Sequence, residues 1–241
     1  MKKLIPALIL IIATIVLVPF LSGAEKMATS IKDIDQSGKA TTDSAFTLSA
    51  LYDSLELNKL GLDRNAFDIA LKGYEKLDVS GKIKNNKLSI VDFSQPSTKK
   101  RLYVIDVAAK KLLFHTYVAH GRNSGQLMAT KFSNTNQSLQ SSLGFFVTAE
   151  KYMGKHGLSM RMDGVEKTNS NARERAVVVH GADYVSEGFI KNTGYLGRSW
   201  GCPAINPELN EPIINAIGNG SCLFIYSPQA DYVSQSSLLS N

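Results

Sequence analysis

Two residues that can act together in nucleophilic catalysis stand near each other in the segment HGADYVSEGFIKNTGYLGRSWGCPAI, which begins at His180. His180 and Gly181 end the apolar run RAVVVHG, and Cys202 lies between a glycine and a proline. A thiol beside an imidazole loses its proton readily, and the thiolate is the reactive form. Such a pair attacks carbonyl carbons, and the amides of Gly201 and Cys202 are candidates to stabilise the oxyanion that results.

Two other roles for Cys202 stay open on the residues alone. The chain has two cysteines, so a disulfide with Cys222 is one alternative. Cys222 lies in the strand pattern SCLFIYS, where a free cysteine would be a small buried side chain. A metal site is the weaker alternative, because the four histidines are scattered without ligand spacing. We expect His115 and His156 to be surface or packing residues, and we expect no metal and no cofactor.

The residues around His180 and Cys202 resemble the L,D-transpeptidase catalytic domain of the YkuD type, and most closely its murein L,D-transpeptidase branch. The family pattern is a His-Gly strand end, a loop, and then Ser/Thr-His-Gly-Cys. Here His180-Gly181 matches the first part, and Ser199-Trp200-Gly201-Cys202 matches the second. The resemblance extends over residues 87–227 and includes the order of the strands.

The resemblance implies a role for each matched residue. Cys202 is the implied nucleophile and His180 the implied general base, with the carbonyl of Gly181 orienting the imidazole. Gly201 and Cys202 supply the implied oxyanion-hole amides. Ser199 and Trp200 belong to the same motif and are expected beside the substrate.

Two positions depart from the family pattern. Trp200 stands where a second histidine is usual, and Ala204 stands where the family often has an arginine or asparagine. A cation that binds the substrate must then come from elsewhere. Arg198, on the other side of the motif, and Arg161, in LSMRMDG, are the two candidates.

The activity that the resemblance implies is acyl transfer on peptidoglycan stem peptides through a thioacyl-enzyme. An amine of another stem as acceptor gives a 3–3 crosslink, whereas water makes the protein an L,D-carboxypeptidase or amide hydrolase. Related enzymes are acylated by carbapenems. The alternative from another class is a cell-wall-binding protein without activity, which the departures at Trp200 and Ala204 favour and the retention of Cys202 and His180 opposes.

The N-terminus predicts export to the periplasm or cell envelope. Lys2 and Lys3 precede an uncharged apolar run that ends in small residues, which is typical of a signal peptide over residues 1–24 or of a membrane anchor. Residues 25–42 are polar and are expected to be a linker. The formal net charge of the whole chain is +6. Because its basic residues form no cluster, we expect no nucleic-acid partner.

The rest of the chain predicts a mainly β protein with added helices. Apolar residues at helical spacing indicate a helical hairpin over 43–80, with its first helix at 45–60 and Asp63 capping its second. Residues 82–230 then form the expected catalytic domain, a YkuD-like β-sandwich or barrel with one packed helix that follows Asn206 and Pro207. The polar segment 121–144 is expected to be a mobile flap over the site rather than a packed element. The expected strands are 87–94, 101–107, 112–121, 144–152, 158–164, 175–181 and 221–227.

Overall fold

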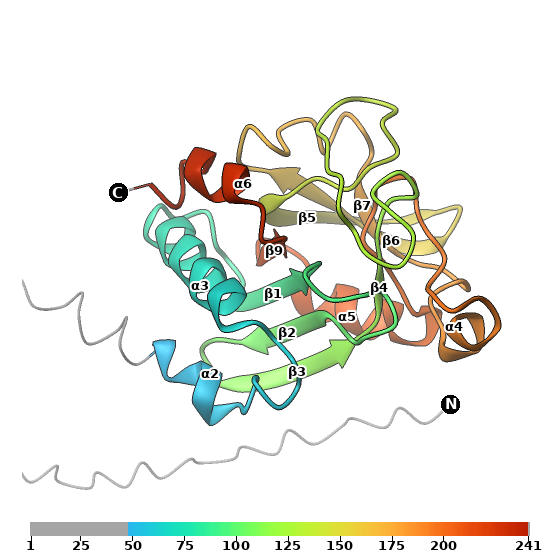
Figure 1. Cartoon of the computed structure of the whole chain (residues 1–241). Coiled ribbons are helices and arrows are strands. Elements are labelled where there is room, and N and C mark those ends of the chain that lie inside the picture. The colour runs from blue at the N-terminus through green and yellow to red at the C-terminus, as the bar shows by residue number, and fades with distance from the viewer. Residues whose placement is uncertain (1–47, 241) are drawn as a thin grey trace, which may run out of the picture. The chain divides into compact units, whose positions relative to one another are not determined.

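The structure is a computed structural model that describes residues 48–240 (Figure 1). The predicted signal peptide or anchor and the predicted linker lie outside the described residues. Within residues 48–240, no helix is long and apolar enough to cross a membrane.

In the described residues, nine strands form one mixed sheet in the order β3-β2-β1-β9-β5-β6-β7-β8-β4. The pairs β1–β9 and β7–β8 are parallel, and the other pairs are antiparallel. The two end strands are joined in sequence through Tyr117 alone, so the sheet curls back on itself and is nearly closed. The strands are β1 (Lys87–Asp92), β2 (Leu102–Asp106), β3 (Lys111–Thr116), β4 (Val118–Ala119), β5 (Gly144–Gly154), β6 (Gly157–Gly164), β7 (Val178–Gly181), β8 (Ala204–Ile205) and β9 (Cys222–Tyr226).

The predicted mainly β fold with added helices is confirmed. Each of the seven expected strand segments contains a strand, and in the turn between β2 and β3 the amide of Ala109 donates to Asp106 Oδ1. Two details were not predicted. The segment 112–121 holds two short strands instead of one, and β8 follows Cys202 directly after one proline.

Two helices, α3 (Arg64–Val79) and α5 (Pro207–Ile217), are capped by the residues that the sequence indicates. Asp63 accepts from the amide of Ala66 at the start of α3, and Asn206 accepts from the amide of Glu208 at the start of α5. Helix α3 lies along β1 (Figure 1), whereas α5 packs on β6 and β7 and so supports the segment that carries His180. The helices are α2 (Leu51–Ser54), α3 (Arg64–Val79), α4 (Glu187–Thr193), α5 (Pro207–Ile217) and α6 (Ala230–Gln235).

The first helix of the predicted hairpin is much shorter than expected. Helix α2 ends at Ser54, and residues 55–61 form turns instead of continuing to residue 60. The reason is the burial of Leu57, which is fully buried although it would leave the apolar face of a continuing helix. Glu56 adopts a left-handed conformation with φ of 51°, and this turn directs Leu57 into the core.

The core lies between α3 and the central strands of the sheet. Phe145 of β5 and Phe224 of β9 stack with ring centroids 4.2 Å apart, and neither is exposed to solvent. The predicted apolar face of α3 is buried against them, including Phe67 and Tyr74. Aromatic side chains bury large apolar areas, and each Å² of apolar surface removed from water stabilises the fold by about 25 cal/mol. This core holds β5 and β9 rigidly, and β5 carries the hairpin that reaches the site.

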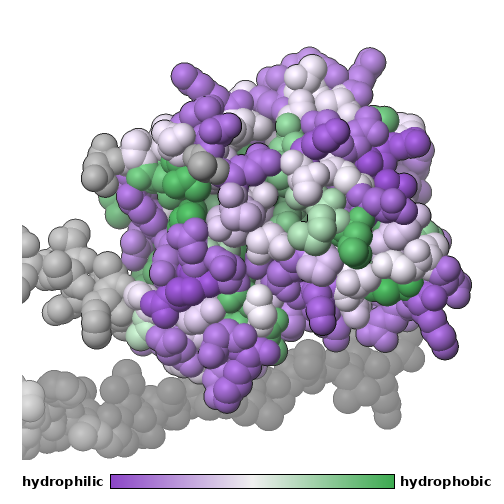
Figure 2. Space-filling view, viewed as in Figure 1, coloured by the Kyte–Doolittle hydropathy of each residue, from purple (hydrophilic) through white to green (hydrophobic). Residues whose placement is uncertain are grey.

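The long segment 121–144 is packed, contrary to the prediction of an unpacked flap. Ser124, Ser141 and Ser142 are buried, and the amide of Ser141 donates to Ser124 Oγ at 2.9 Å. Small hydroxyl side chains satisfy the backbone of the loop internally, which lets a polar segment pack. The face of the molecule that Figure 2 shows, viewed as in Figure 1, is mostly hydrophilic, with hydrophobic residues in separate small patches.

Candidate functional site

His180 lies at the centre of the site, on the short strand β7. It pairs with Ser159 of β6 on one side and with Ala204 of β8 on the other. Its Nδ1 is 2.8 Å from the carbonyl oxygen of Gly181. Because a carbonyl only accepts, Nδ1 must carry the proton, and Nε2 keeps its lone pair. Burial lowers the pKa of His180, while the Gly181 carbonyl opposes that shift. His180 is therefore a neutral imidazole, able to accept a proton at Nε2.

The parallel pairing of β7 with β8 places Cys202 beside this histidine. His180 is level with Ala204, so Cys202, two residues earlier, is level with Val178. The amide of Val178 donates to Cys202 Sγ at 3.5 Å. Val178 and His180 are two residues apart and face the same side of the strand. Cys202 and His180 consequently line one cavity of about 580 Å³.

The thiol of Cys202 is held by backbone groups. Besides accepting from Val178, it donates to the carbonyl of Ala176 at 3.7 Å. Burial raises the pKa of Cys202, and the Val178 amide and the Arg175 guanidinium oppose this shift. The thiol therefore rests protonated at neutral pH. The cost of burying the charge exceeds what these partners return.

Ser199 and Gly201 shape the turn that presents Cys202. Ser199 Oγ donates to the carbonyl of Cys202 at 2.6 Å and accepts from the amide of Gly201 at 3.1 Å. Ser199 is buried, so it braces the turn. The Gly201 amide is occupied by this bond, whereas the amide of Cys202 faces its own thiol. Gly201 has φ of +125°, and a Cβ there would come within 2.7 Å of the Gln140 carbonyl.

Arg175 connects the loop 121–144 to the thiol. Its Nη1 donates to the Ser133 carbonyl at 2.8 Å and to Ser142 Oγ at 2.6 Å. Its Nη2 donates to the Gln140 carbonyl at 2.7 Å and to Ser138 Oγ at 3.1 Å. The same guanidinium is close enough to Cys202 to lower the pKa of the thiol. Arg175 was not predicted as a site residue, although it opens the RAVVVHG segment.

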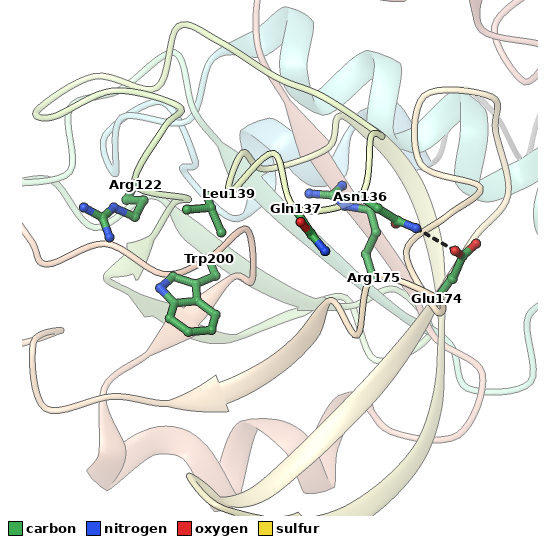
Figure 3. Close-up of a pocket in the computed structure, with 7 residues that line it drawn as sticks. All are labelled: Arg122, Asn136, Gln137, Leu139, Glu174, Arg175 and Trp200. Carbon is green, nitrogen blue, oxygen red and sulfur yellow. Dashed lines mark hydrogen bonds between the residues drawn. The ribbon is translucent and has the colours of Figure 1, made fainter.

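A second hollow of about 610 Å³ adjoins the cavity and shares Trp200 and Arg175 with it (Figure 3). Trp200 is 72% exposed and stands left of centre in Figure 3, below Leu139 and Arg122. The far end of the hollow is closed by a hydrogen bond of 2.5 Å from Asn136 to Glu174. An exposed indole between two hollows offers a flat apolar surface to a bound chain.

The two predicted cations take different places. Arg198 lines the cavity, donates to the Gly125 carbonyl at 3.3 Å and lies over the Tyr195 ring. Arg161 does not line it, because its guanidinium is bound to Glu150 at 3.2 Å and lies behind the ring of Tyr152. Of the two candidates, Arg198 alone is placed to meet a ligand.

Three aromatic or imidazole side chains of the cavity were not predicted. Tyr152 and His156 come from the β5–β6 hairpin, and Tyr184 follows β7. Burial raises the pKa of Tyr184 to about 12, so its phenol stays neutral and can donate. His156 is exposed, as expected of a surface residue, but it stacks on His180 inside the site. His115 packs on the Tyr103 ring outside the cavity, as predicted.

A buried pair supports the Cys202 turn from behind. The amide of Ser199 donates to the His120 carbonyl at 3.0 Å. The His120 ring is 2.7 Å from Arg101 Nη2, and Arg101 also donates to the Val118 carbonyl. Burial lowers the pKa of Arg101 to about 9, and burial together with this cation lowers the pKa of His120 to about 3. The pair therefore fixes the end of β4, on which the turn rests.

Both cysteines are free. Cys222 is fully buried in β9, as the strand pattern predicts, and Cys202 is in the cavity. The structure thus contains no disulfide between them. Among residues 48–240, no three His, Cys, Asp or Glu side chains are grouped so that they could hold a metal ion.

Several solved structures are similar to parts of this chain at low identity. An L,D-transpeptidase from Mycobacterium smegmatis is 15% identical, with 59% of each chain covered and a TM-score of 0.37. An L,D-transpeptidase mutant from Enterococcus faecium is 14% identical, with 60% of this chain and 50% of that chain covered and a TM-score of 0.37. The helical cell shape determining protein Pgp2 from Campylobacter jejuni is 13% identical, with 70% and 61% covered and a TM-score of 0.38. The chain therefore spans about three fifths of the length of such relatives.

A comparison with curated proteins finds no match. A family model, described as the L,D-transpeptidase catalytic domain, matches residues 58–226. The matched range contains α3, all nine strands and the turn that holds Cys202. This match extends over most of the sequence, and the chain belongs to the L,D-transpeptidase catalytic domain family.

Proposed function

We propose that the protein is a cell-envelope enzyme that transfers acyl groups of peptidoglycan stem peptides through a thioester on Cys202. The observation that carries this proposal is the placement of one free thiol and one neutral imidazole in the same cavity. Nδ1 of His180 is held by the Gly181 carbonyl, which leaves Nε2 to act as the base. Neither feature is needed merely to bind a glycan or a peptide.

The proposed acylation begins with transfer of the thiol proton to His180 Nε2. The Cys202 thiolate then attacks the carbonyl carbon of the third stem residue, a diamino acid, and a tetrahedral oxyanion forms. The Cys202 amide is the better candidate to stabilise it, because the Gly201 amide already donates to Ser199 Oγ. The C–N bond breaks, the imidazolium returns its proton to the leaving nitrogen, and D-alanine departs.

Deacylation repeats the same steps with a new nucleophile. His180 takes a proton from the acceptor amine, whose nitrogen attacks the thioester carbonyl. The Cys202 thiolate leaves and is protonated again by the imidazolium. An amine of a second stem gives a 3–3 crosslink, whereas water gives the tripeptide product of an L,D-carboxypeptidase.

The lining of the cavity supports a peptide substrate with a free carboxylate. Arg198 offers a guanidinium that can bind a carboxylate by two parallel hydrogen bonds. Tyr184 adds a neutral phenol, and exposed Trp200 offers an apolar wall. The N-terminal sequence, read as a signal peptide or anchor, would deliver these groups to the compartment that holds peptidoglycan.

The test is release of D-alanine from a purified stem tetrapeptide by the purified protein. We expect release by the native protein and none by the Cys202→Ala variant, which keeps the fold. Mass spectrometry of the products then separates a crosslinked dimer from a tripeptide. Absence of both D-alanine and an acyl-protein adduct would refute the proposal.

A further inference from the structure

The imidazole of His156 lies parallel to that of the proposed base. The two ring centroids are 4.6 Å apart, and the ring planes differ by 24°. His156 is in the turn between β5 and β6, whereas His180 is on β7, so two separate elements bring the rings together. His156 is exposed and His180 is buried. One face of the base is thus covered by a ring that remains in contact with water.

We propose that His156 is a positioning residue for His180: its ring fixes the plane of the base, and its charge governs how readily His180 accepts the Cys202 proton. The inference rests on the proposed function, because it concerns the same thiol and imidazole. Among the described residues that line the cavity, His156 carries the one imidazole besides that of His180. Trp200 occupies the motif position where a second histidine is usual.

The effect of the His156 charge on His180 follows from the short distance between the two rings. When His180 takes the thiol proton it becomes an imidazolium, and a neutral ring stacked on it presents its electron-rich face. A protonated His156 would instead place a second positive charge against it, and His156 accordingly lowers the pKa of His180.

Other charged or titratable groups surround the two rings. Tyr152 and Lys155 face them from the β5–β6 hairpin, and Tyr184 from the segment after β7. Arg175, Arg198 and Cys202 are the other charged or titratable groups that line the cavity, while Asp183 and Glu211 line another hollow that also includes His156. None of these others stacks on His180. Replacing His156 therefore removes the stacked ring without changing any other group that lines the cavity.

The experiment measures the rate of Cys202 alkylation by iodoacetamide between pH 5 and 9 in the full-length protein. The native protein should lose rate toward acid as His180 becomes protonated and can no longer accept the thiol proton. His156→Phe keeps a stacked ring without the charge. We expect it to match the native rate at pH 8 within about twofold and to be about threefold slower near pH 5.5, because loss of the His156 charge raises the pKa of His180 and the base is then protonated at higher pH.

A second variant of His156 separates the effect of the ring from that of its charge, and a variant of His115 is the control. His156→Ala removes both and should slow alkylation at pH 8 about fivefold, because the base is no longer held in its plane. His115→Phe is the matched control, since His115 stacks on Tyr103 at 4.5 Å outside the cavity, and it should leave the profile unchanged. Superimposable profiles for the native protein, His156→Phe and His156→Ala would overturn the inference. Because alkylation requires no stem peptide, that result is independent of whether D-alanine is released.

Discussion

Cys202 Sγ lies 3.5 Å from the backbone nitrogen of Val178, two residues before His180 in the same strand. This contact follows from the parallel register in which His180 is level with Ala204. The thiol is thus positioned by strand pairing and not by a direct hydrogen bond to the imidazole.

The first prediction separates the two cysteines by their access to a reagent. Intact-mass analysis after alkylation without reductant should find one modified residue, Cys202, because Cys222 is fully buried in β9. Cys202→Ser should remove alkylation, carbapenem acylation and D-alanine release together, since a serine hydroxyl is far less ionised beside the same imidazole.

Cys222→Ser is the matched control for that variant. It should keep the chemistry and lose stability by about 1–3 kcal/mol, because the new hydroxyl lacks a partner in an apolar strand. Thermal unfolding monitored by circular dichroism measures the loss. A protein with no alkylated cysteine in the native state, or equal loss of activity in both variants, would contradict the assignment of Cys202 as nucleophile.

The second prediction concerns Arg175, which both holds the loop 121–144 and lies near the thiol. Arg175→Lys keeps the charge but cannot make the four hydrogen bonds of the guanidinium. We expect faster amide exchange over residues 133–142 in this variant, measured by hydrogen–deuterium exchange. The alkylation rate at pH 7 should change little, because a cation remains in place.

Arg175→Met removes the charge as well as the hydrogen bonds. Because the cation lowers the pKa of Cys202, its loss should raise that pKa further and slow alkylation at pH 7. The acceptors left without partners should reduce stability by about 2–4 kcal/mol. If residues 133–142 exchange equally in the native protein and in both variants, Arg175 does not hold the loop.

Patterns within single segments were enough to predict most of the fold. Asp63 and Asn206 cap the helices as their positions indicate, and each predicted strand segment contains a strand. The predicted length of the first helix was wrong, because the spacing of apolar residues does not reveal that Leu57 is buried by a turn. Burial through irregular backbone is a tertiary effect, and local propensity gives way to it.

In the candidate site too, local sequence patterns predicted some residues, and the others depend on tertiary structure. Cys202 and His180 could be named from their neighbours in the sequence, and the structure brings them into one cavity. Arg161 could not be rejected in advance, since its pairing with Glu150 depends on which residues share a face of β5 and β6. His156 was missed for the same reason: a histidine in a turn has no local signal, and its role depends on where the hairpin ends.

The third prediction tests Arg198 as the group that binds the stem carboxylate. Arg198→Lys should reduce kcat/KM for D-alanine release about tenfold, mainly through a higher KM, because lysine cannot form two parallel hydrogen bonds. Arg161→Lys is the matched control, since Arg161 is held by Glu150 away from the cavity. Steady-state kinetics on the tetrapeptide measures both. Equal constants for the native protein and Arg198→Lys would remove Arg198 from the site.

The last prediction concerns acid stability and the buried His120. Burial and Arg101 lower its pKa from 6.5 to about 3 in the folded protein. In the unfolded chain His120 therefore binds a proton near pH 6.5, whereas in the folded protein it binds that proton only near pH 3. Stability from this group is complete above pH 6.5 and is lost as the pH falls toward 3, by up to about 5 kcal/mol.

Urea unfolding between pH 7 and 4 measures this dependence, and His120→Gln isolates it. Glutamine offers an acceptor to Arg101 Nη2 and does not titrate, so the variant should start less stable at pH 7 and lose less stability toward pH 4. The Cys202 turn rests on the His120 carbonyl through Ser199, so acid should also disturb the nucleophile before the sheet unfolds. Parallel stability curves for the native protein and His120→Gln would show that the proton is taken up elsewhere.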